Sequence, residues 1–180
     1  MLSIEKCPAP ANTLLRKYSI SGAYTDCYWT EVPRRVSFSE FIFAFYTTPL
    51  FKLERFILKL FVTKPSTDIQ ARQLAECICE TFAAWHVEAR SEKEILMCDF
   101  RGRTRSWLML VPADKAGRTQ LYFGSAVIPN AKTGTLSLGF GYQALLGFHQ
   151  IYSVLLLYSA KLRLQHPLGS SYEKQDQFDR

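Results

Sequence analysis

The stretch RSWLMLVPADKAGRTQLYFGSAVI, residues 105–128, decides the fold. Two runs of strand length, 105–113 and 118–128, flank the turn-forming segment Asp114-Lys115-Ala116-Gly117. A connection this short forces the two strands to pair antiparallel, because a parallel return needs a crossover of about a dozen residues or more. The stretch therefore predicts an antiparallel hairpin, and it excludes a doubly wound parallel sheet.

Two further strand-length runs lie upstream, at His86–Arg90 and Glu94–Arg101. The polar segments Ser91-Glu92-Lys93 and Arg101-Gly102-Arg103 separate them from each other and from the hairpin. Because every connection is short, the four runs predict one continuous antiparallel meander over residues 86–128. This meander is the centre of the expected sheet.

The third strand of the meander is apolar on both faces. Trp107, Met109 and Val111 alternate along it with Leu108 and Leu110, and alternate side chains of a strand point to opposite faces of a sheet. Both faces must therefore be covered by other parts of the chain. In the last strand, a run of glycine, serine and alanine leaves space where a helix or a ligand can approach the sheet.

Capping signals predict helices between the first strand and the meander. The segment Ser37-Phe38-Ser39-Glu40 matches the capping box, in which the serine and glutamate side chains bond to each other's backbone amides. Thr48-Pro49 supplies an N-cap before a proline at the first helical position, and Thr67 with Gln70 forms another capping box. The expected elements here are a strand at Ala23–Val32 and helices at Phe38–Thr47, Pro49–Val62 and Asp68–Phe82.

A long helix is expected at the end of the fold, over Phe140–Gln165, after a brief strand near Leu136. Its apolar residues form two stripes, so the helix is apolar nearly all round. One stripe holds Tyr142, Leu145, Leu146, His149, Tyr152, Ser153 and Leu156, and the other holds Phe148, Ile151, Leu155, Tyr158 and Leu162. Together with the apolar run Phe41–Tyr46, the stripes exceed what one core of this size needs, which predicts a homodimer.

The order of expected elements resembles the START-like helix-grip fold, an α+β architecture. In that fold an antiparallel sheet wraps on a long C-terminal helix, and two or three short helices follow the first strand. Three segments, Tyr24–Tyr28, Arg90–Leu96 and Leu145–Ser153, look more narrowly like an uncharacterised bacterial family near that superfamily. The resemblance covers residues 22–165 and implies no activity. Known relatives of the fold mostly enclose hydrophobic ligands between sheet and helix, so it implies a cavity there.

Composition describes a single folded domain. The chain has 22 Lys and Arg against 16 Asp and Glu, for a formal net charge of +6, and 48% of its residues are apolar, which excludes the disordered and collagen-like classes. The basic residues are spread along the chain and interleaved with acids, which argues against a nucleic-acid partner. We expect an extended N-terminal arm at 1–20, a single domain at 21–168 and a polar C-terminal tail at 169–180.

The sequence predicts a cytoplasmic protein without a membrane span. The N-terminus lacks the uninterrupted apolar stretch of a signal peptide. Five cysteines without a CxxC pair favour a reducing compartment, where all five stay reduced. Polar residues such as Gln150 and Lys161 interrupt the most apolar segment, Phe140–Leu164, so this segment is expected to be a core helix.

Two local patterns do not predict a site. Cys77, Cys79 and His86 lack a fourth ligand at a usual zinc spacing, so no metal is expected. Residues 139–144 match GxGxxA, but no early βαβ unit surrounds them and no acidic residue follows about 20 positions on, so no dinucleotide cofactor is expected. The sequence also lacks the signatures of the common hydrolases, metalloproteases, nucleotidases and redox enzymes.

Strand alternation and helix spacing can bring four ring-bearing side chains toward the space above Gly124 and Ala126. These candidate ligand-binding residues are Trp107, Tyr122, His149 and Tyr152, with Arg101 and Arg103 as candidate anion ligands at the cavity mouth. The leading hypothesis is a soluble binding protein for a hydrophobic or lipid-like small molecule. Two alternatives stay open: a small cyclase, hydratase or isomerase that uses His149 with Asp99 or Asp26, and a homo-oligomerising interaction domain. Each candidate also has a plain structural interpretation, as core packing or a solvated turn.

Overall fold

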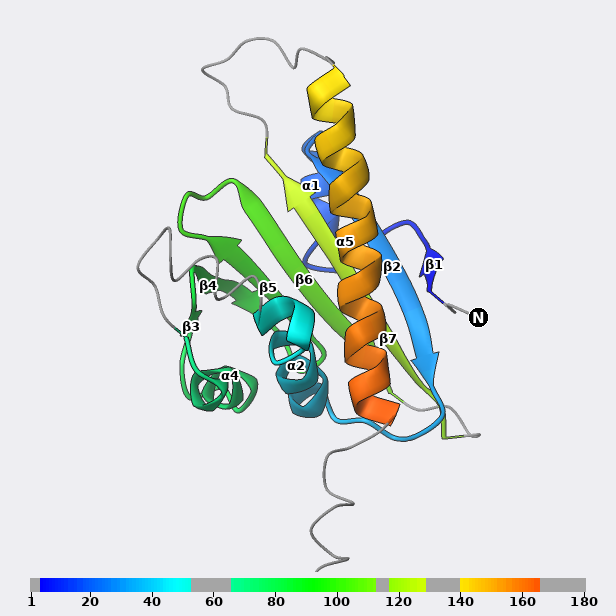
Figure 1. The fold of residues 1–180 in the computed structure, drawn as a ribbon, viewed down its shortest axis with the longest axis vertical. Coiled ribbons are helices and arrows are strands. Elements are labelled where there is room, and N and C mark those ends of the chain that lie inside the picture. Colours follow the sequence, from blue (N-terminus) through cyan, green and yellow to red (C-terminus); the bar gives the residue numbers. More distant parts are fainter. Residues whose placement is uncertain (1–3, 53–65, 113–116, 129–139, 166–180) are drawn as a thin grey trace, which may run out of the picture.

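The computed structural model describes residues 4–52, 66–112, 117–128 and 140–165, with only the backbone described over 140–149. Within these residues, seven strands form one antiparallel sheet with the order β1-β2-β7-β6-β5-β4-β3 (Figure 1). The strands are β1 (Glu5–Lys6), β2 (Tyr24–Val32), β3 (Thr81–Phe82), β4 (Trp85–Arg90), β5 (Glu94–Asp99), β6 (Thr104–Val111) and β7 (Thr119–Val127). The consecutive pairing of β4, β5, β6 and β7 confirms the meander predicted over 86–128.

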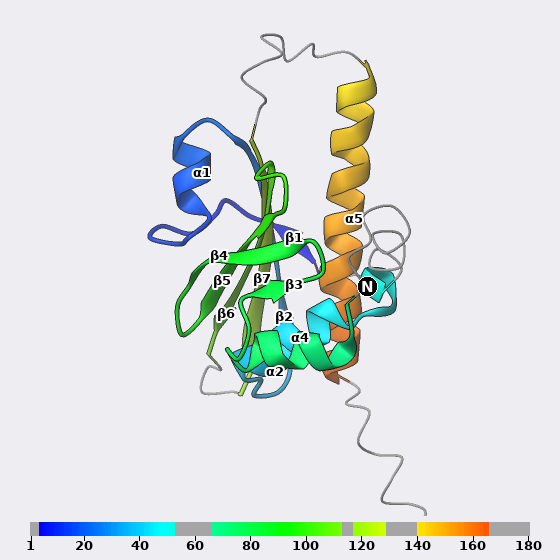
Figure 2. The same ribbon diagram turned by 90° about the vertical axis from the view of Figure 1, so that its left-hand side faces the viewer.

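Helices cover both faces of this sheet. The labelled helices of the described residues are α1 (Arg16–Ile20), α2 (Phe38–Tyr46), α4 (Asp68–Ala75) and α5 (Phe140–Gln165). The long helix α5 lies over β2 and β7, while α1 lies on the opposite side of the sheet (Figure 2). The architecture is α+β, and α5 has the predicted bounds. Residues 49–52 are also helical; the rest of the helix predicted to Val62 and the strand predicted near Leu136 lie outside the described residues.

The capping signals determine where two of these helices begin. At the start of α2, the Ser37 hydroxyl accepts a hydrogen bond from the Glu40 amide at 3.2 Å, while the Glu40 carboxylate accepts one from the Ser37 amide at 2.7 Å. Thr67 and Gln70 form the same reciprocal pair at the start of α4. Each pair satisfies backbone donors that the first helical turn leaves without partners.

The helix predicted over Asp68–Phe82 is too long, because α4 ends at Ala75 and the short strand β3 follows. Cys77 adopts a left-handed conformation with a φ of 60°. The amide of Ile78 then donates to the carbonyl of Gln73 at 2.8 Å, which is the hydrogen bond of a Schellman C-cap. Glycine usually occupies the left-handed position of this cap, because it has no Cβ to strain. A cysteine there gives no stop signal in the sequence.

The N-terminal arm was predicted to be extended over residues 1–20, but its described part, residues 4–20, forms a second layer of the fold. Its first part pairs with β2 as β1, and its last part forms α1. Leu15, just before α1, is fully buried in one cluster with Trp107 and Met109. This layer covers the second apolar face of β6, which would otherwise be exposed to water. The core that the described residues form therefore consists of two clusters, one on each side of the sheet.

A charged network holds α1 against the sheet. Glu88 on β4 accepts hydrogen bonds from Lys17 and Tyr18 of α1, and it forms an ion pair with Arg105 of β6. Burial alone would raise the pKa of the Glu88 carboxyl, but the hydrogen bonds from Lys17 and Tyr18 and the charge of Arg105 outweigh burial and lower that pKa. The stabilisation from Glu88 is therefore present above the pKa of an unperturbed glutamate and is lost as the pH falls through the folded-state pKa.

All five cysteines of the chain are free thiols in the structure. Cys7 directly follows β1, and its Sγ lies 3.4 Å from the Sγ of Cys27 in β2. Burial raises the pKa of both thiols, which favours the protonated form. The thiolate is the reactive form of cysteine, so both side chains are expected to react slowly with oxidants and alkylating agents.

Candidate functional site

A cavity of about 210 Å³ lies between the sheet and α5, where the resemblance to helix-grip proteins implies one. Its apolar lining residues are Phe45, Phe51, Trp85, Phe123, Tyr152 and Leu156. The Phe45 ring packs against the rings of Phe51 and Phe123, with centroid separations of 6.1 Å and 4.8 Å. These separations lie within the range of favourable aromatic pairs. The rings of Phe45, Phe51 and Phe123 therefore form one continuous surface, which we call the aromatic wall of the cavity.

Three serines, Ser106, Ser125 and Ser153, give the same cavity a polar side. Two of them bond to the carboxylate of Asp26, which is only 3% exposed. Oδ1 of Asp26 accepts from the Ser125 amide at 3.0 Å, and Oδ2 accepts from the Ser153 hydroxyl at 3.5 Å. Asp26 thus connects β2 to both β7 and α5. The arrangement presents hydroxyl groups, held in place by a buried acid, to whatever occupies the cavity.

Local sequence features explain how these side chains reach the cavity. Phe123 and Ser125 are two residues apart in β7, so they share the face that α5 covers. Ser153 and Leu156 are three residues apart in α5, so they share its sheet-facing side. The capping box that begins α2 fixes the position of the helix that carries Phe45. Three elements that are distant in sequence therefore supply one cavity.

The residues predicted to bind a ligand do not all lie in this cavity. Tyr152 lines it, as expected. The side chain of His149 lies outside the described residues, so the proposed roles of this histidine stay predictions. Trp107 and Tyr122 lie on the other face of the sheet, in the cluster that the N-terminal layer covers. The expectation that these four residues share one space is therefore wrong for the two strand residues.

Strand parity explains this correction. Alternation along β6 separates Trp107 from Leu108, but it does not reveal which of the two faces α5 covers. In the structure Leu108 packs under α5, and Trp107 is buried on the opposite side, where its indole donates to Glu94 Oε2 at 2.8 Å. The space expected above Gly124 is occupied, because a Cβ at that position would lie 2.5 Å from Leu15 Cδ2. A side chain of the arm fills the space that was expected to admit a ligand.

Arg101 and Arg103 also lie away from the cavity, in the turn between β5 and β6, where both are exposed. The Arg101 guanidinium lies 5.2 Å from the ring centroid of Phe100. Asp99 accepts hydrogen bonds from the amides of Arg103 and Thr104, at 2.6 Å and 3.0 Å. Asp99 therefore organises this turn. Of the two acids considered as partners for His149, Asp26 is the one beside the cavity.

Three cavity residues, Phe45, Ser106 and Ser125, carry no distinguishing signal in the sequence. Phe45 belongs to an apolar run that any buried helix could show, and the serines resemble ordinary small residues of a strand. Their shared position depends on which strands pair and on where α5 lies. Only the fold supplies that information.

Neither protein-family models, nor curated proteins, nor solved structures gave a match to this sequence. None of the helices in the described part of the chain combines the length and apolarity of a membrane-spanning segment. Among the same residues there is no group of three or more histidine, cysteine, aspartate or glutamate side chains that could hold a metal ion. The cavity with its aromatic wall and serine hydroxyls is therefore the starting point for assigning a function.

Proposed function

We propose that the protein is a binding protein with a helix-grip fold, and that it holds a small apolar molecule with one polar end between the sheet and α5. The observation that carries this proposal is the cavity itself, whose lining combines an aromatic wall with a few polar residues, Thr104, Arg105, Ser106, Ser125 and Ser153. Such a combination of a mainly apolar lining with a few polar groups is typical of small-molecule sites. The order of the strands, with helices after β2 and a long helix over β7, supports the helix-grip assignment.

The size of the cavity narrows the ligand class. Its volume of about 210 Å³ lies below the range of roughly 300–1,000 Å³ that is usual for drug-sized ligands. A single aromatic ring with a short substituent suits this space better than a long acyl chain. The aromatic wall would stack against the ring, and a serine hydroxyl would bond to a ligand hydroxyl or amine.

Blocking the cavity tests the proposal. Ser106, on β6, lines the cavity and is nearly buried, so Ser106→Phe should place a ring in the ligand's space. Phenol, indole and benzene serve as probes in titrations followed by amide chemical shifts. We expect phenol and indole to bind more tightly than benzene. Ser106→Phe should weaken both by at least about tenfold, which corresponds to about 1.4 kcal/mol.

Ser106→Ala is the matched control, because it leaves the space open and should keep the affinity for indole close to that of the wild type. Thermal unfolding of both variants establishes that they fold. Equal affinity of a folded Ser106→Phe variant and the wild type for indole would contradict the proposal. The absence of binding by all three probes to the wild type would contradict it as well.

The predicted homodimer is favoured by a specific feature of α5. Ile151, Leu155 and Leu162 lie on one of the predicted stripes and are 62%, 43% and 40% exposed. A second copy of the chain could cover this stripe by a symmetric helix–helix contact. We expect sedimentation equilibrium to give about twice the chain mass of 20.7 kDa, and Leu155→Glu to give a monomer.

Ile69→Glu is the control for this prediction, because Ile69 is an exposed apolar residue on a different helix. It should leave the dimer intact. A wild-type protein that sediments as a monomer at all concentrations tested would contradict the dimer.

The cytoplasmic location and the reduced state of the five thiols stay predictions from the cysteine pattern.

A further inference from the structure

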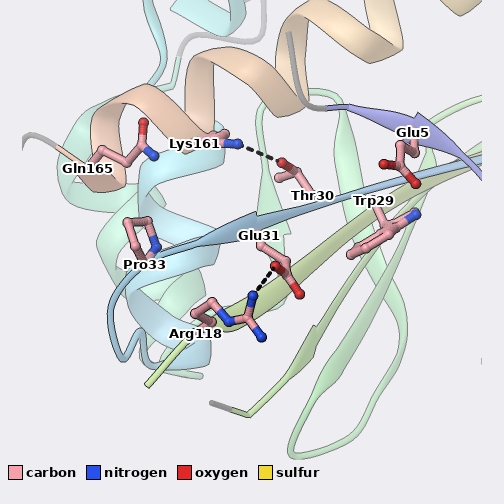
Figure 3. Close-up of a pocket in the computed structure, with 8 residues that line it drawn as sticks. All are labelled: Glu5, Trp29, Thr30, Glu31, Pro33, Arg118, Lys161 and Gln165. Atoms are coloured by element: carbon pink, nitrogen blue, oxygen red, sulfur yellow. Dashed lines mark hydrogen bonds and ion pairs between the residues drawn. The ribbon is translucent and has the colours of Figure 1, made fainter. Parts of the chain in front are cut away.

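A second hollow, separate from the cavity, lies at the edge of the sheet beyond the end of β1 (Figure 3). It has a volume of about 330 Å³, and we call it the edge groove. Its lining includes Glu5, Trp29, Glu31, Arg118, Lys161 and Gln165. The groove thus brings together residues of β1, β2 and the last turns of α5. Arg118, which directly precedes β7, also lines it. Thr30 points toward α5, while its neighbours in β2 point to the other face, so the groove passes across the edge of β2.

Lys161 is the unusual residue of this groove. Its side chain is nearly buried, with only 9% of the residue exposed, and Nζ lies 3.0 Å from the Thr30 hydroxyl oxygen. Lysine is among the residues that are least often buried. Figure 3 shows the side chain leaving α5 and reaching over β2 toward Thr30. The helix and the strand therefore hold the amine in one position at the wall of the groove.

The surroundings of Lys161 make its amine easier to deprotonate than that of an exposed lysine. Burial lowers the pKa of Lys161, and the negative charge of Glu31 acts in the opposite direction but does not outweigh burial. Among the described residues, the other charged groups that line the groove are Glu5 on β1 and Arg118, whose guanidinium lies 3.6 Å from the Glu31 carboxylate. Only a neutral amine is a nucleophile, and a desolvated lysine is a recognised way to obtain one.

A flat apolar surface lines the same groove. The Trp29 indole stacks on the Tyr122 ring, with centroids 6.3 Å apart and an angle of 23° between the planes. This contact holds the indole in place, so one of the groove's walls is a fixed aromatic face. A ligand that reaches Lys161 along the edge of β2 can therefore gain aromatic contact as well.

We propose that Lys161 forms a reversible imine with a small aromatic aldehyde bound in the edge groove. The Nζ lone pair adds to the carbonyl carbon, which forms the C–N bond and opens the C=O double bond. Both hydrogens of the amine move to the carbonyl oxygen, which leaves as water when the C=N bond forms. Carbon, nitrogen and oxygen keep their total oxidation level, so no oxidant or reductant takes part in the step.

Reductive trapping tests this proposal. The full-length protein is incubated at neutral pH with benzaldehyde and sodium cyanoborohydride, which reduces any imine to a stable amine, and peptide mapping then gives the labelled fraction at each lysine. We expect Lys161 to be labelled at least tenfold faster than Lys93, which is exposed to solvent. Labelling of Lys161 at the rate of Lys93 or more slowly would overturn the proposal.

Charge substitutions give a second, independent readout. Because the charge of Glu31 raises the pKa of Lys161, Glu31→Gln should lower that pKa further and increase the rate of labelling about twofold or more at neutral pH. Glu92→Gln removes a carboxylate in the exposed β4–β5 turn and should leave the rate unchanged. A slower rate in Glu31→Gln than in the wild type would overturn the role assigned to the neutral amine.

The ligand class is tested by comparing two aldehydes. Trp29→Leu removes the aromatic face, so it should slow the labelling of Lys161 by benzaldehyde about fivefold while leaving labelling by propanal unchanged. Circular dichroism and thermal unfolding establish that this variant folds. An equal change with both aldehydes would overturn the assignment of an aromatic ligand.

Discussion

Replacing Gly124 by alanine is expected to lower the free energy of unfolding by about 3 kcal/mol. A Cβ at this position would lie 2.5 Å from Leu15 Cδ2, 2.8 Å from the carbonyl oxygen of Asp26 and 3.1 Å from Trp107 Cε3. The leucine side chain can rotate away, but the Asp26 carbonyl is part of β2. This strand pairs with β7 along its whole length, so the backbone cannot retreat without disturbing the pairing. Urea denaturation followed by circular dichroism measures the loss.

Gly102→Ala is the matched control for this prediction. Gly102 has a φ of +68°, and a Cβ there would meet no atom within 4 Å. Its replacement should therefore cost only the strain of a left-handed alanine, about 1 kcal/mol. If Gly124→Ala costs no more than Gly102→Ala, then the N-terminal layer is not packed on β7 as the structure describes.

The fold was predictable where the signals are local. The short connections require neighbouring strands to pair antiparallel, and this pairing determines the meander. The capping box determines where α2 begins, because Ser37 and Glu40 bond to each other's amides. The prediction failed at the end of α4, where Cys77 takes the left-handed conformation that glycine normally signals. The sequence rule for a helix end is reliable when glycine takes the left-handed position. It fails when another residue, here Cys77, takes that position and accepts the strain.

The candidate site was less predictable, because its residues meet through long-range contacts. Alternation along β6 separates its two faces correctly, but the choice of face depends on whether α5 or the N-terminal arm lies there. Trp107 looked like a pocket residue because it is large and amphipathic, yet Leu15 and Glu94 cover it. From the sequence, Asp26 was only one of two candidate acidic partners for His149. Its burial and the donors that bond to its carboxylate are known only from the fold.

Replacing Asp26 by alanine is expected to destabilise the protein by about 3 kcal/mol. The Asp26 carboxylate accepts hydrogen bonds from both the amide and the hydroxyl of Ser125, and both residues are 3% exposed. Alanine offers these two donors no acceptor, and an unsatisfied buried polar group costs about 1–3 kcal/mol. Asp26→Asn keeps one acceptor oxygen, so it should cost less than the alanine. Urea denaturation of the two variants gives the comparison.

Ser153→Ala separates the two sides of the Asp26 carboxylate. The Ser153 hydroxyl lies 3.5 Å from Oδ2, at the limit of a hydrogen bond, so its removal should cost about 1 kcal/mol or less. Because Asp26 holds Ser125 at the cavity, Asp26→Ala should also weaken phenol binding, and Asp26→Asn should weaken it less, whereas a purely structural acid would change stability alone. An Asp26→Ala variant as stable as Ser153→Ala would show that Ser125 finds another acceptor, and the cavity's polar side would then not depend on the buried acid.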